Sequence, residues 1–336
     1  MMRKRITYWV IWIFALCGVL LGIGLFSLCV GTTDIPFTTL ISLIYGDKDT
    51  TYHTILFNIR LPRILLGFAI GGALSLAGVL LQGMFRNPLV EPYTLGISGG
   101  AALGVALNIV FQLYRKAGVF SLPLFGFLGA MFVIFILYVL STRKEVLKIE
   151  SLLLTGVMIS FISSSLIMLI MAISRAEDLH GIIFWIMGSL EEPNWFLIKL
   201  ASFISMLGLI ISYCFSVHLN ALSLGEEEAL HLGINVERTK RSLFILASLL
   251  TGFSVSVAGI IGFVGLVVPH FMRMVIGGDH RILLISSFLC GAAFLIFCDT
   301  LARTILSPSE LPVGVITGIL GGSLFVYALS KRQMIS

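Results

Sequence analysis

Charged side chains are scarce in this chain of 336 residues: only 12% are Asp, Glu, Lys or Arg, whereas 58% are hydrophobic. A water-soluble globule needs many more polar side chains to cover its surface. The composition therefore excludes a soluble fold and predicts a protein embedded in membrane lipid. The net charge of +5 does not indicate a nucleic-acid partner, because the basic residues lie mostly between apolar runs, where they set orientation in a membrane.

Motifs for catalysis, nucleotide binding and metal binding are also missing. The chain has no HExxH, GxSxG or GxxxxGK[ST] sequence, and no aspartate pair lies within an apolar run. Its five cysteines occur without a CxxC or an accompanying histidine cluster, so we expect small hydrophobic side chains and not metal ligands. We predict no catalytic residues, no metal site and no cofactor on this chain.

Apolar runs long enough to cross a bilayer recur along the whole sequence. A spanning helix needs about 20 apolar residues. Nine runs approach this length, and a tenth, at 262–276, is shorter and interrupted by Pro269. The nine lie near 8–30, 63–84, 94–111, 118–140, 151–173, 195–216, 242–261, 282–302 and 312–330. We predict one all-α, polytopic transmembrane domain over residues 1–336 with about ten helices. We expect both termini to be cytoplasmic, because most lysines and arginines then lie on the cytoplasmic side of the membrane.

A short sequence and a proline recur at one offset. Ser75–Leu80, SLAGVL, is repeated as Ser256–Ile261, SVAGII, and Pro88 is repeated as Pro269, each 181 residues later (256 − 75 and 269 − 88). With ten crossings the two copies run in opposite directions, which is the inverted repeat of many transporters. Helices rich in small residues also produce such matches by chance, so both interpretations stay open.

The second apolar run ends in an Asn-Pro pair, which disfavours further helix and leaves carbonyl groups that need partners. We interpret Gln82, Asn87 and Pro88 at this end, and Pro269 in the repeat-related position, as structural residues first and as hinges second.

The longest inner loop, at about 220–241, reads NALSLGEEEALHLGINVERTKR from Asn220. Its run of three glutamates favours the start of a short helix through the helix dipole, and Gly233 can end that helix. Ala229, Leu230 and Leu232 offer a small apolar contact surface. The loop is therefore either a docking platform for a partner or a solvated loop helix.

Five motifs give the chain a family resemblance. They are RLPR, GxxLQGxxxNPLxxPxxLGxxxGAA, LGEEEALHLGI, GxIGFVGLxVPHxxR and LPVGVITGILGGSLF, in this order between Arg60 and Phe325. They resemble the FecCD family, the permeases of ATP-driven importers for iron-siderophores, haem and cobalamin. Gly321-Gly322-Ser323 stands where the family more often has Gly-x-Pro.

The resemblance implies an assembly in the cytoplasmic (inner) membrane of a bacterium or archaeon. Its expected parts are ten helices per subunit and a homodimer or heterodimer of permease subunits, whose interface forms the translocation path. Two cytoplasmic ABC ATPases would carry the ATP and Mg, and one external substrate-binding protein would deliver the substrate.

The resemblance also assigns roles to residues. Arg60, Arg63 and Arg303 match positions that hold glutamates of the binding protein, a task that suits the guanidinium fork. The residues alone allow another interpretation, in which Arg60 and Arg63 anchor a helix end and Arg303 pairs with Asp299 one turn earlier. The segment that resembles the ATPase-coupling helices contains Leu224, Gly225, Glu227, Glu228, Ala229, Leu232 and Gly233. The fifth run lines the path in the family, and its candidates are Met158, Ser160, Ser164 and Met168, for which ordinary packing is the alternative.

We therefore expect the permease subunit of a metal-chelate importer that works by alternating access, with ferric siderophore as the first substrate and haem or cobalamin as alternatives. An ion-coupled secondary transporter would normally need acids within the membrane. Asp299 is the only acidic residue inside a strong apolar run, and it lies four residues from Arg303, so a coupling-ion site is poorly supported.

Overall fold

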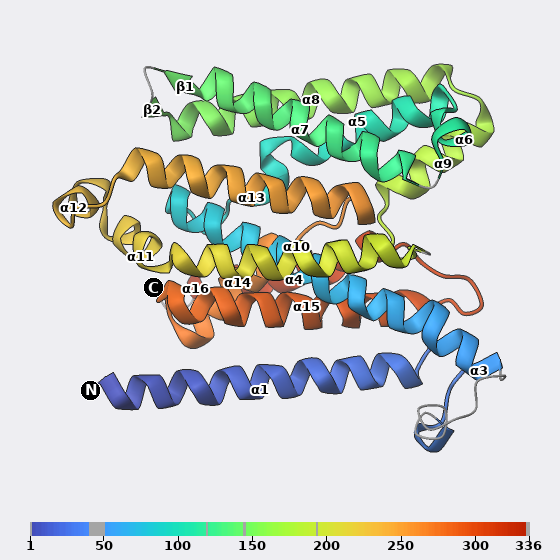
Figure 1. The fold of residues 1–336 in the computed structure, drawn as a ribbon, viewed down its shortest axis with the longest axis horizontal. Helices are drawn as coiled ribbons and strands as arrows, with labels where there is room; N and C mark the ends of the chain where they lie inside the picture. Colours follow the sequence, from blue (N-terminus) through green and yellow to red (C-terminus); the bar gives the residue numbers. More distant parts are fainter. Residues whose placement is uncertain (1, 40–50, 119, 144–145, 193, 334–336) are drawn as a thin grey trace.

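The fold is a bundle of long helices that lie side by side (Figure 1). The computed structural model describes residues 2–39, 51–118, 120–143, 146–192 and 194–333. Seven helices are long and apolar enough to cross a membrane, and three shorter ones are apolar. The seven are α1 (Met2–Cys29), α4 (Leu61–Phe85), α7 (Ser121–Ser141), α8 (Ile149–Ile173), α10 (Trp195–Cys214), α13 (Val236–Ala258) and α15 (His280–Thr304). The shorter three are α5 (Ile97–Val110), α14 (Val264–Ile276) and the apolar part, Val313–Ala328, of α16 (Val313–Gln333).

Each apolar run expected from the sequence coincides with one of these helices, so the all-α polytopic fold is confirmed. One expectation is wrong, because Pro269 does not interrupt its helix: α14 continues through it, and the chain instead leaves helical structure between Ala258 and Val264. Both ends of the chain lie at the same end of the bundle (Figure 1). The number of crossings and the side of the membrane on which the termini lie stay predictions.

Short elements connect the long helices. Before α4 come α3 (Thr51–Thr54) and η1 (Ile55–Arg60), one turn of π-helix that continues directly into it. The remaining connections are η2 (Pro92–Leu95), α6 (Leu113–Ala117), α9 (Ala176–Ile186), α11 (Ser216–Leu224), α12 (Glu226–His231) and the hairpin strands β1 (Thr142–Arg143) and β2 (Val146–Leu147). The helix α9 was not predicted, because it is too short to span a bilayer.

The helix α4 forms the centre of the bundle, and it packs on α10, α13, α14 and α15. Its glycines allow backbones to approach closely, as small residues do in membrane interfaces. A methyl group at Gly71 would collide with the carbonyl oxygen of Gly291 in α15, and one at Gly78 would collide with that of Gly265 in α14. The close packing of α4 on α14 and α15 therefore requires glycine at these two positions.

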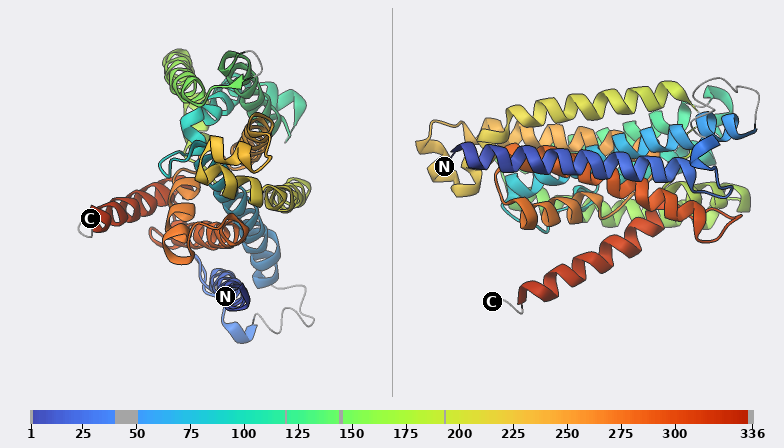
Figure 2. Two further views of the ribbon diagram at one scale, coloured as in Figure 1. Left: turned by 90° about the vertical axis from the view of Figure 1, so that its left-hand side faces the viewer. Right: turned by 90° about the horizontal axis from the view of Figure 1, so that it is seen from below.

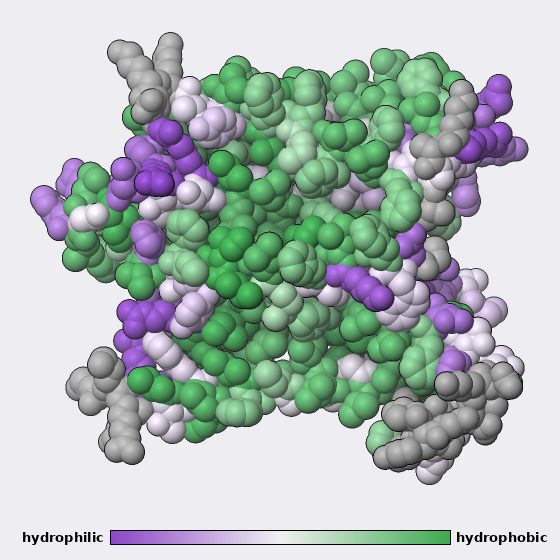
Figure 3. All heavy atoms as spheres, viewed as in Figure 1, coloured by the Kyte–Doolittle hydropathy of each residue, from purple (hydrophilic) through white to green (hydrophobic). Residues whose placement is uncertain are grey.

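Apolar side chains cover the middle of the molecule, and polar side chains gather at its two ends (Figure 3). The helices α1 and α8 lie at opposite edges of the bundle (Figure 1). Beyond its first turns, α16 leans away from the other helices (Figure 2). Its side chains Ile319, Leu324, Val326 and Tyr327 are exposed in the single chain.

The two copies of the repeated sequence do not occupy equivalent places. Ser75–Leu80 lies in the middle of α4, whereas Ser256–Ile261 begins in the last turn of α13 and continues into the loop after it. Pro88 lies in a turn after α4, whereas Pro269 lies inside α14. The offset of 181 residues therefore does not superimpose structurally matching residues, and the inverted repeat stays a prediction.

Candidate functional site

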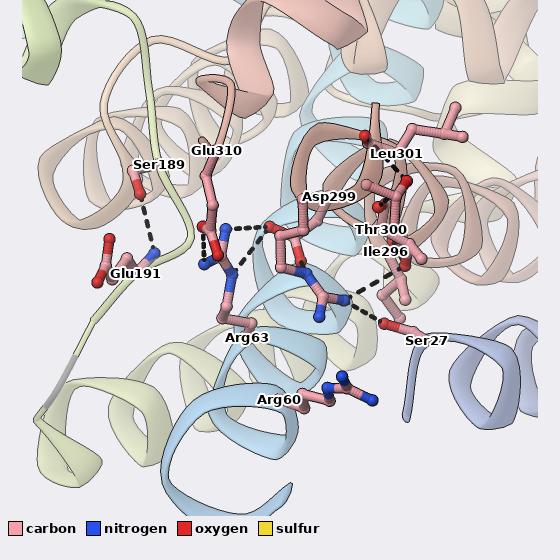
Figure 4. A network of polar contacts seen from close by, with 12 residues as sticks. Ser27, Arg60, Arg63, Ser189, Glu191, Ile296, Asp299, Thr300, Leu301 and Glu310 are labelled. Carbon is pink, nitrogen blue, oxygen red and sulfur yellow. Dashed lines mark hydrogen bonds and ion pairs between the residues drawn. The ribbon is translucent and has the colours of Figure 1, made fainter. Parts of the chain in front are cut away.

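A network of arginines and carboxylates ties α4 to α15 (Figure 4). Asp299 Oδ1 accepts hydrogen bonds from Arg63 Nε at 3.1 Å and Arg63 Nη2 at 2.9 Å. Asp299 Oδ2 accepts one from Arg303 Nε at 3.0 Å. Arg63 Nη1 also pairs with Glu310 Oε2 at 2.6 Å, and Arg303 Nη2 donates to Ser27 Oγ of α1 at 2.8 Å. The pairing of Arg303 with Asp299, one of the two interpretations of the sequence, is confirmed.

The three arginines expected to dock the binding protein are buried in the single chain. Arg60, Arg63 and Arg303 are 2%, 5% and 3% exposed. Arg60 donates to the carbonyl oxygens of Leu28, in the last turn of α1, and of Thr33, which follows that helix. A buried guanidinium needs partners, and each of these three finds them within the fold. Their role in docking a binding protein stays a prediction. Only at Glu310, whose side chain is 36% exposed, does this network of described residues reach the surface.

The same network bears on ion coupling. Both carboxylate oxygens of Asp299 are held by arginine side chains, and Asp299 is 1% exposed. An ion-coupling acid must exchange a proton or a cation during the cycle, whereas this carboxylate is fixed between two cations. The geometry therefore supports a structural role for Asp299.

The predicted inner loop folds into two short helices, α11 and α12, which protrude at the end of the bundle where both termini lie (Figure 1). Gly225 lies directly before α12. Gly233 follows the helix with a φ of +79°, a left-handed conformation that favours glycine. The start and end expected for this helix are confirmed.

The apolar side chains of this loop point in different directions. Leu224, Leu230 and Leu232 are 66%, 59% and 63% exposed, whereas Ala229 is fully buried. The expectation that Ala229 offers contact surface is therefore wrong, because its methyl group packs into the core. Glu227 and Glu228 are exposed beside the leucines. The exposed surface of the loop is thus Leu224, Leu230 and Leu232 with an acidic margin, and we call it the α12 surface.

A buried lysine beneath the α12 surface escaped the sequence analysis. Lys240 of α13 is 4% exposed, and its Nζ lies 2.6 Å from Glu226 Oε2 of α12 and 3.5 Å from Glu237 Oε1. Glu237 Oε2 accepts a hydrogen bond from the backbone N–H of Leu147 at 2.8 Å. The spacing of Glu237 and Lys240 on one helix was a visible signal, but neither distant partner was.

Gln82 joins α4 to α14. Its Nε2 donates to the carbonyl oxygens of Gly265 at 3.3 Å and Leu266 at 3.2 Å, and its Oε1 accepts from Arg273 Nη1 at 3.1 Å. Pro269 has no N–H to donate to the carbonyl oxygen of Gly265, four residues before it. The side chain of Gln82 supplies that hydrogen bond instead. Gln82 and Pro269, which lie far apart in the sequence, therefore meet at one contact between α4 and α14.

The turn after α4 is fixed by its own polar groups. Asn87 Oδ1 accepts from the N–H of Leu89 at 2.9 Å, a turn that Asn side chains favour. Further along, Glu91 Oε1 accepts from Phe263 N at 2.7 Å, and Tyr93 donates its hydroxyl to the Ile261 carbonyl at 2.8 Å. The segment around Pro88 is thereby attached to the loop before α14, a contact that sequence analysis missed because the partners lie about 170 residues apart.

The candidates for path lining lie on α8. Met158 and Met168 are 48% and 68% exposed, Ser164 is exposed, and Ser160 Oγ donates to the Gly156 carbonyl within the helix at 3.0 Å. A stripe of four buried residues attaches α8 to η2 and α5: Leu152, Gly156, Ser163 and Ile167. Met158, Ser164 and Met168 are exposed in the single chain, so three of the four candidates can face a partner or a path.

Asp279, just before α15, connects Arg5 near the start of α1 to Asn220 of α11. It pairs with Arg5 at 3.2 Å, and Asn220 Nδ2 donates to it at 2.9 Å. Burial works against its ionisation, but these hydrogen bonds and the charges of Arg281 and Arg5 hold the pKa of Asp279 below its usual value. Within the described residues, no three His, Cys, Asp or Glu side chains are grouped to hold a metal ion.

Comparisons with known proteins agree with this geometry. The chain matches the FecCD transport family over residues 19–331. It is similar to the hemin transport system permease protein HmuU of Yersinia pestis, with 40% identity over 94% of this chain and 93% of that protein. It is also similar to the Fe(3+) dicitrate transport system permease protein FecD of Escherichia coli, with 39% identity over 94% of this chain and 96% of that protein.

A solved structure shares the fold. It is an inward-facing metal-chelate type ABC transporter, and it aligns with a TM-score of 0.85 and 32% identity over 95% of this chain and 98% of that one. The sequence matches and the long apolar helices make this a multi-pass protein of the inner membrane. The chain belongs to the FecCD transport family and is the permease subunit of an ABC importer.

Proposed function

We propose that this chain forms the translocation path for a metal chelate, with ferric siderophore as the first candidate and haem or cobalamin as alternatives. The path alternates between outward and inward access, and a separate ATPase chain hydrolyses the ATP. The observation that carries this proposal is the α12 surface, three exposed leucines at one polar end of a bundle with an apolar middle. The iron-bearing substrates in the names of the two relatives support a metal chelate.

The α12 surface is the proposed contact for the ATPase. Exposed leucines gathered in nine residues of a protruding loop favour burial against a partner. We expect Leu230→Asp to release the ATPase on purification. The matched control is His231→Asp, on the same short helix, which adds a negative charge without removing an apolar side chain. An ATPase that stays bound to Leu230→Asp would remove this contact from the proposal.

A second permease subunit is the proposed partner of α8 and α16. These two helices leave much apolar side-chain surface open in the single chain, and α8 also presents the hydroxyl of Ser164. Co-expression of two differently tagged copies distinguishes the pairings. Co-purification of both tags indicates a homodimer, and recovery of one tag together with a related permease indicates a heterodimer.

Docking of the external binding protein is proposed at the exposed edge of the arginine network. There Arg63 meets the half-exposed Glu310, and a glutamate of the binding protein would take the place of Glu310 in this pair. Glu310→Gln should then tighten binding, because the internal competitor for Arg63 loses its charge. Unchanged affinity would remove Arg63 from the docking site.

Transport by the whole assembly tests the function directly. The chain is reconstituted in liposomes with its ATPase and binding protein, and uptake of ferric siderophore, hemin and cobalamin is measured with and without ATP. Accumulation of one chelate only with ATP is the expected result and identifies the substrate. Accumulation driven by an ion gradient without ATP would refute the proposal.

A further inference from the structure

A continuous chain of polar contacts runs from the α12 surface to the start of α8. Its first step is the pair between Glu226 of α12 and Lys240 of α13, with 2.6 Å between Oε2 and Nζ. Its second step joins Lys240 to Glu237, one turn earlier on α13, at 3.5 Å. One lysine side chain therefore connects a short surface helix to a long helix of the bundle.

The third step leaves α13 for the hairpin that precedes α8. Glu237 Oε2 accepts from the N–H of Leu147 at 2.8 Å. Leu147 is 1% exposed and is the last residue of β2, two residues before α8 begins at Ile149. Its partner in the hairpin is Thr142 of β1, directly after α7. The carboxylate of Glu237 thus holds the junction between α7 and α8.

These contacts resist separation for a physical reason. The side chain of Lys240 is only 5% exposed, whereas those of Glu226 and Glu237 are 39% and 32% exposed. A buried ammonium group that lost its carboxylates would be strongly destabilised. When α12 moves, the ion pair therefore stays closed and Lys240 moves with it. Packed contacts of this kind can carry motion from one structural element to another.

We propose that Lys240 and Glu237 are positioning residues that couple movement of α12 to the first turn of α8. The proposal rests on the proposed contact between α12 and the ATPase. It deepens that function, because it names the route by which nucleotide-driven movement reaches a helix proposed to line the path. The alternative is a static attachment that only holds the loop in place.

Two readouts separate coupling from static attachment, each on the full transporter in liposomes. The first is uptake per ATP hydrolysed, with whichever of ferric siderophore, hemin and cobalamin the unmodified transporter accumulates. The second is the rate at which a maleimide labels Val146→Cys, a position in β2 that is 43% exposed, before and after ATP with vanadate. The exposed Cys214 is replaced by serine in all variants.

In Lys240→Met we expect an ATPase that still binds and hydrolyses ATP. Uptake per ATP should fall by about fivefold or more, the lower end of coupling between sites, and nucleotide should no longer change the labelling at Val146→Cys. Lys240→Arg keeps the cation and should keep both readouts. Arg238→Met, which removes an exposed cation from the same turn of α13, is the matched control and should behave as the unmodified chain.

A second pair of variants tests the last step if Lys240→Met does not fold. Glu237→Leu removes the oxygen that accepts from Leu147, while Lys240 retains Glu226. Its control is Arg238→Leu, which makes the same change at the neighbouring exposed position. Uncoupling in Glu237→Leu alone supports the proposal. Equal coupling in both, or unchanged coupling in Lys240→Met, would overturn it while leaving the ATPase contact intact. Failure of the unmodified chain to retain an ATPase would overturn both.

Discussion

Removing the charge of Asp299 should strongly destabilise the protein. Asp299→Asn keeps the shape of the side chain but leaves two buried arginines, Arg63 and Arg303, without their shared carboxylate. Three charge-assisted hydrogen bonds of 2.9 to 3.1 Å are affected. Breaking a buried ion pair by removing one partner costs about 3–5 kcal/mol. At roughly 2 °C per kcal/mol for a chain of this size, the thermal midpoint in detergent should fall by about 6–10 °C.

The matched control is Glu310→Gln, which touches the same arginine. The Glu310 carboxylate makes one hydrogen bond to Arg63, and its side chain is 36% exposed. Water can replace much of that interaction, so we expect Glu310→Gln to lower the free energy of unfolding by about 1 kcal/mol or less. Midpoints are measured by the temperature dependence of the folded peak in size-exclusion chromatography. Equal, small shifts for Asp299→Asn and Glu310→Gln would refute the view that buried charges hold α4 and α15 together.

Three further predictions follow from single contacts. Gly78→Ala should lower the yield of folded protein because its methyl group meets backbone atoms, whereas Gly22→Ala, with open space around it, should not. Gln82→Leu should cost about 1–3 kcal/mol, and less in a Pro269→Ala background, where an N–H is restored to α14; additive costs in denaturation would contradict this. Asp279 has a lowered pKa, so its contribution to stability is present above its unfolded pKa of about 3.9 and is lost as the pH falls through the lower folded value. The midpoints of Asp279→Asn and the unmodified chain should therefore differ near pH 6 and converge in acid.

The positions of the long helices could be predicted from the sequence because a bilayer imposes one dominant requirement. Every crossing needs an apolar run of about 20 residues with its backbone hydrogen bonds satisfied internally. That requirement is local, so α8 and α15 are visible in the sequence almost to the residue. The short helix α9 is not required to span the bilayer, so its length and composition do not reveal it. Only the acidic residues of its first turn, Glu177 and Asp178, indicate a helix start.

The environment of charged residues could not be predicted in the same way. Arg60 and Arg63 lie next to an apolar run, where arginines commonly reach toward the water at the membrane interface. Whether they do so depends on α15 and on the end of α1, which supply their partners from distant parts of the chain. Only the pairing of Arg303 with Asp299 was predictable, because one helical turn separates them.

Gln82 and Pro269 show why spacing alone does not reveal a role. A proline inside a helix leaves a carbonyl group without its usual donor and often marks a kink. In α14 that carbonyl belongs to Gly265, the same residue against which Gly78 of α4 packs, so α4 lies close enough for Gln82 to donate to it. Gly78 lets α4 approach α14, and Gln82 then supplies the hydrogen bond that Pro269 cannot make. The helix α14 therefore continues through Pro269 without a break. The hinge expected at Pro269 would have to break the contact with Gln82 in order to move. The non-helical segment before α14 offers no easier pivot, because Tyr93 and Glu91 hold Ile261 and Phe263.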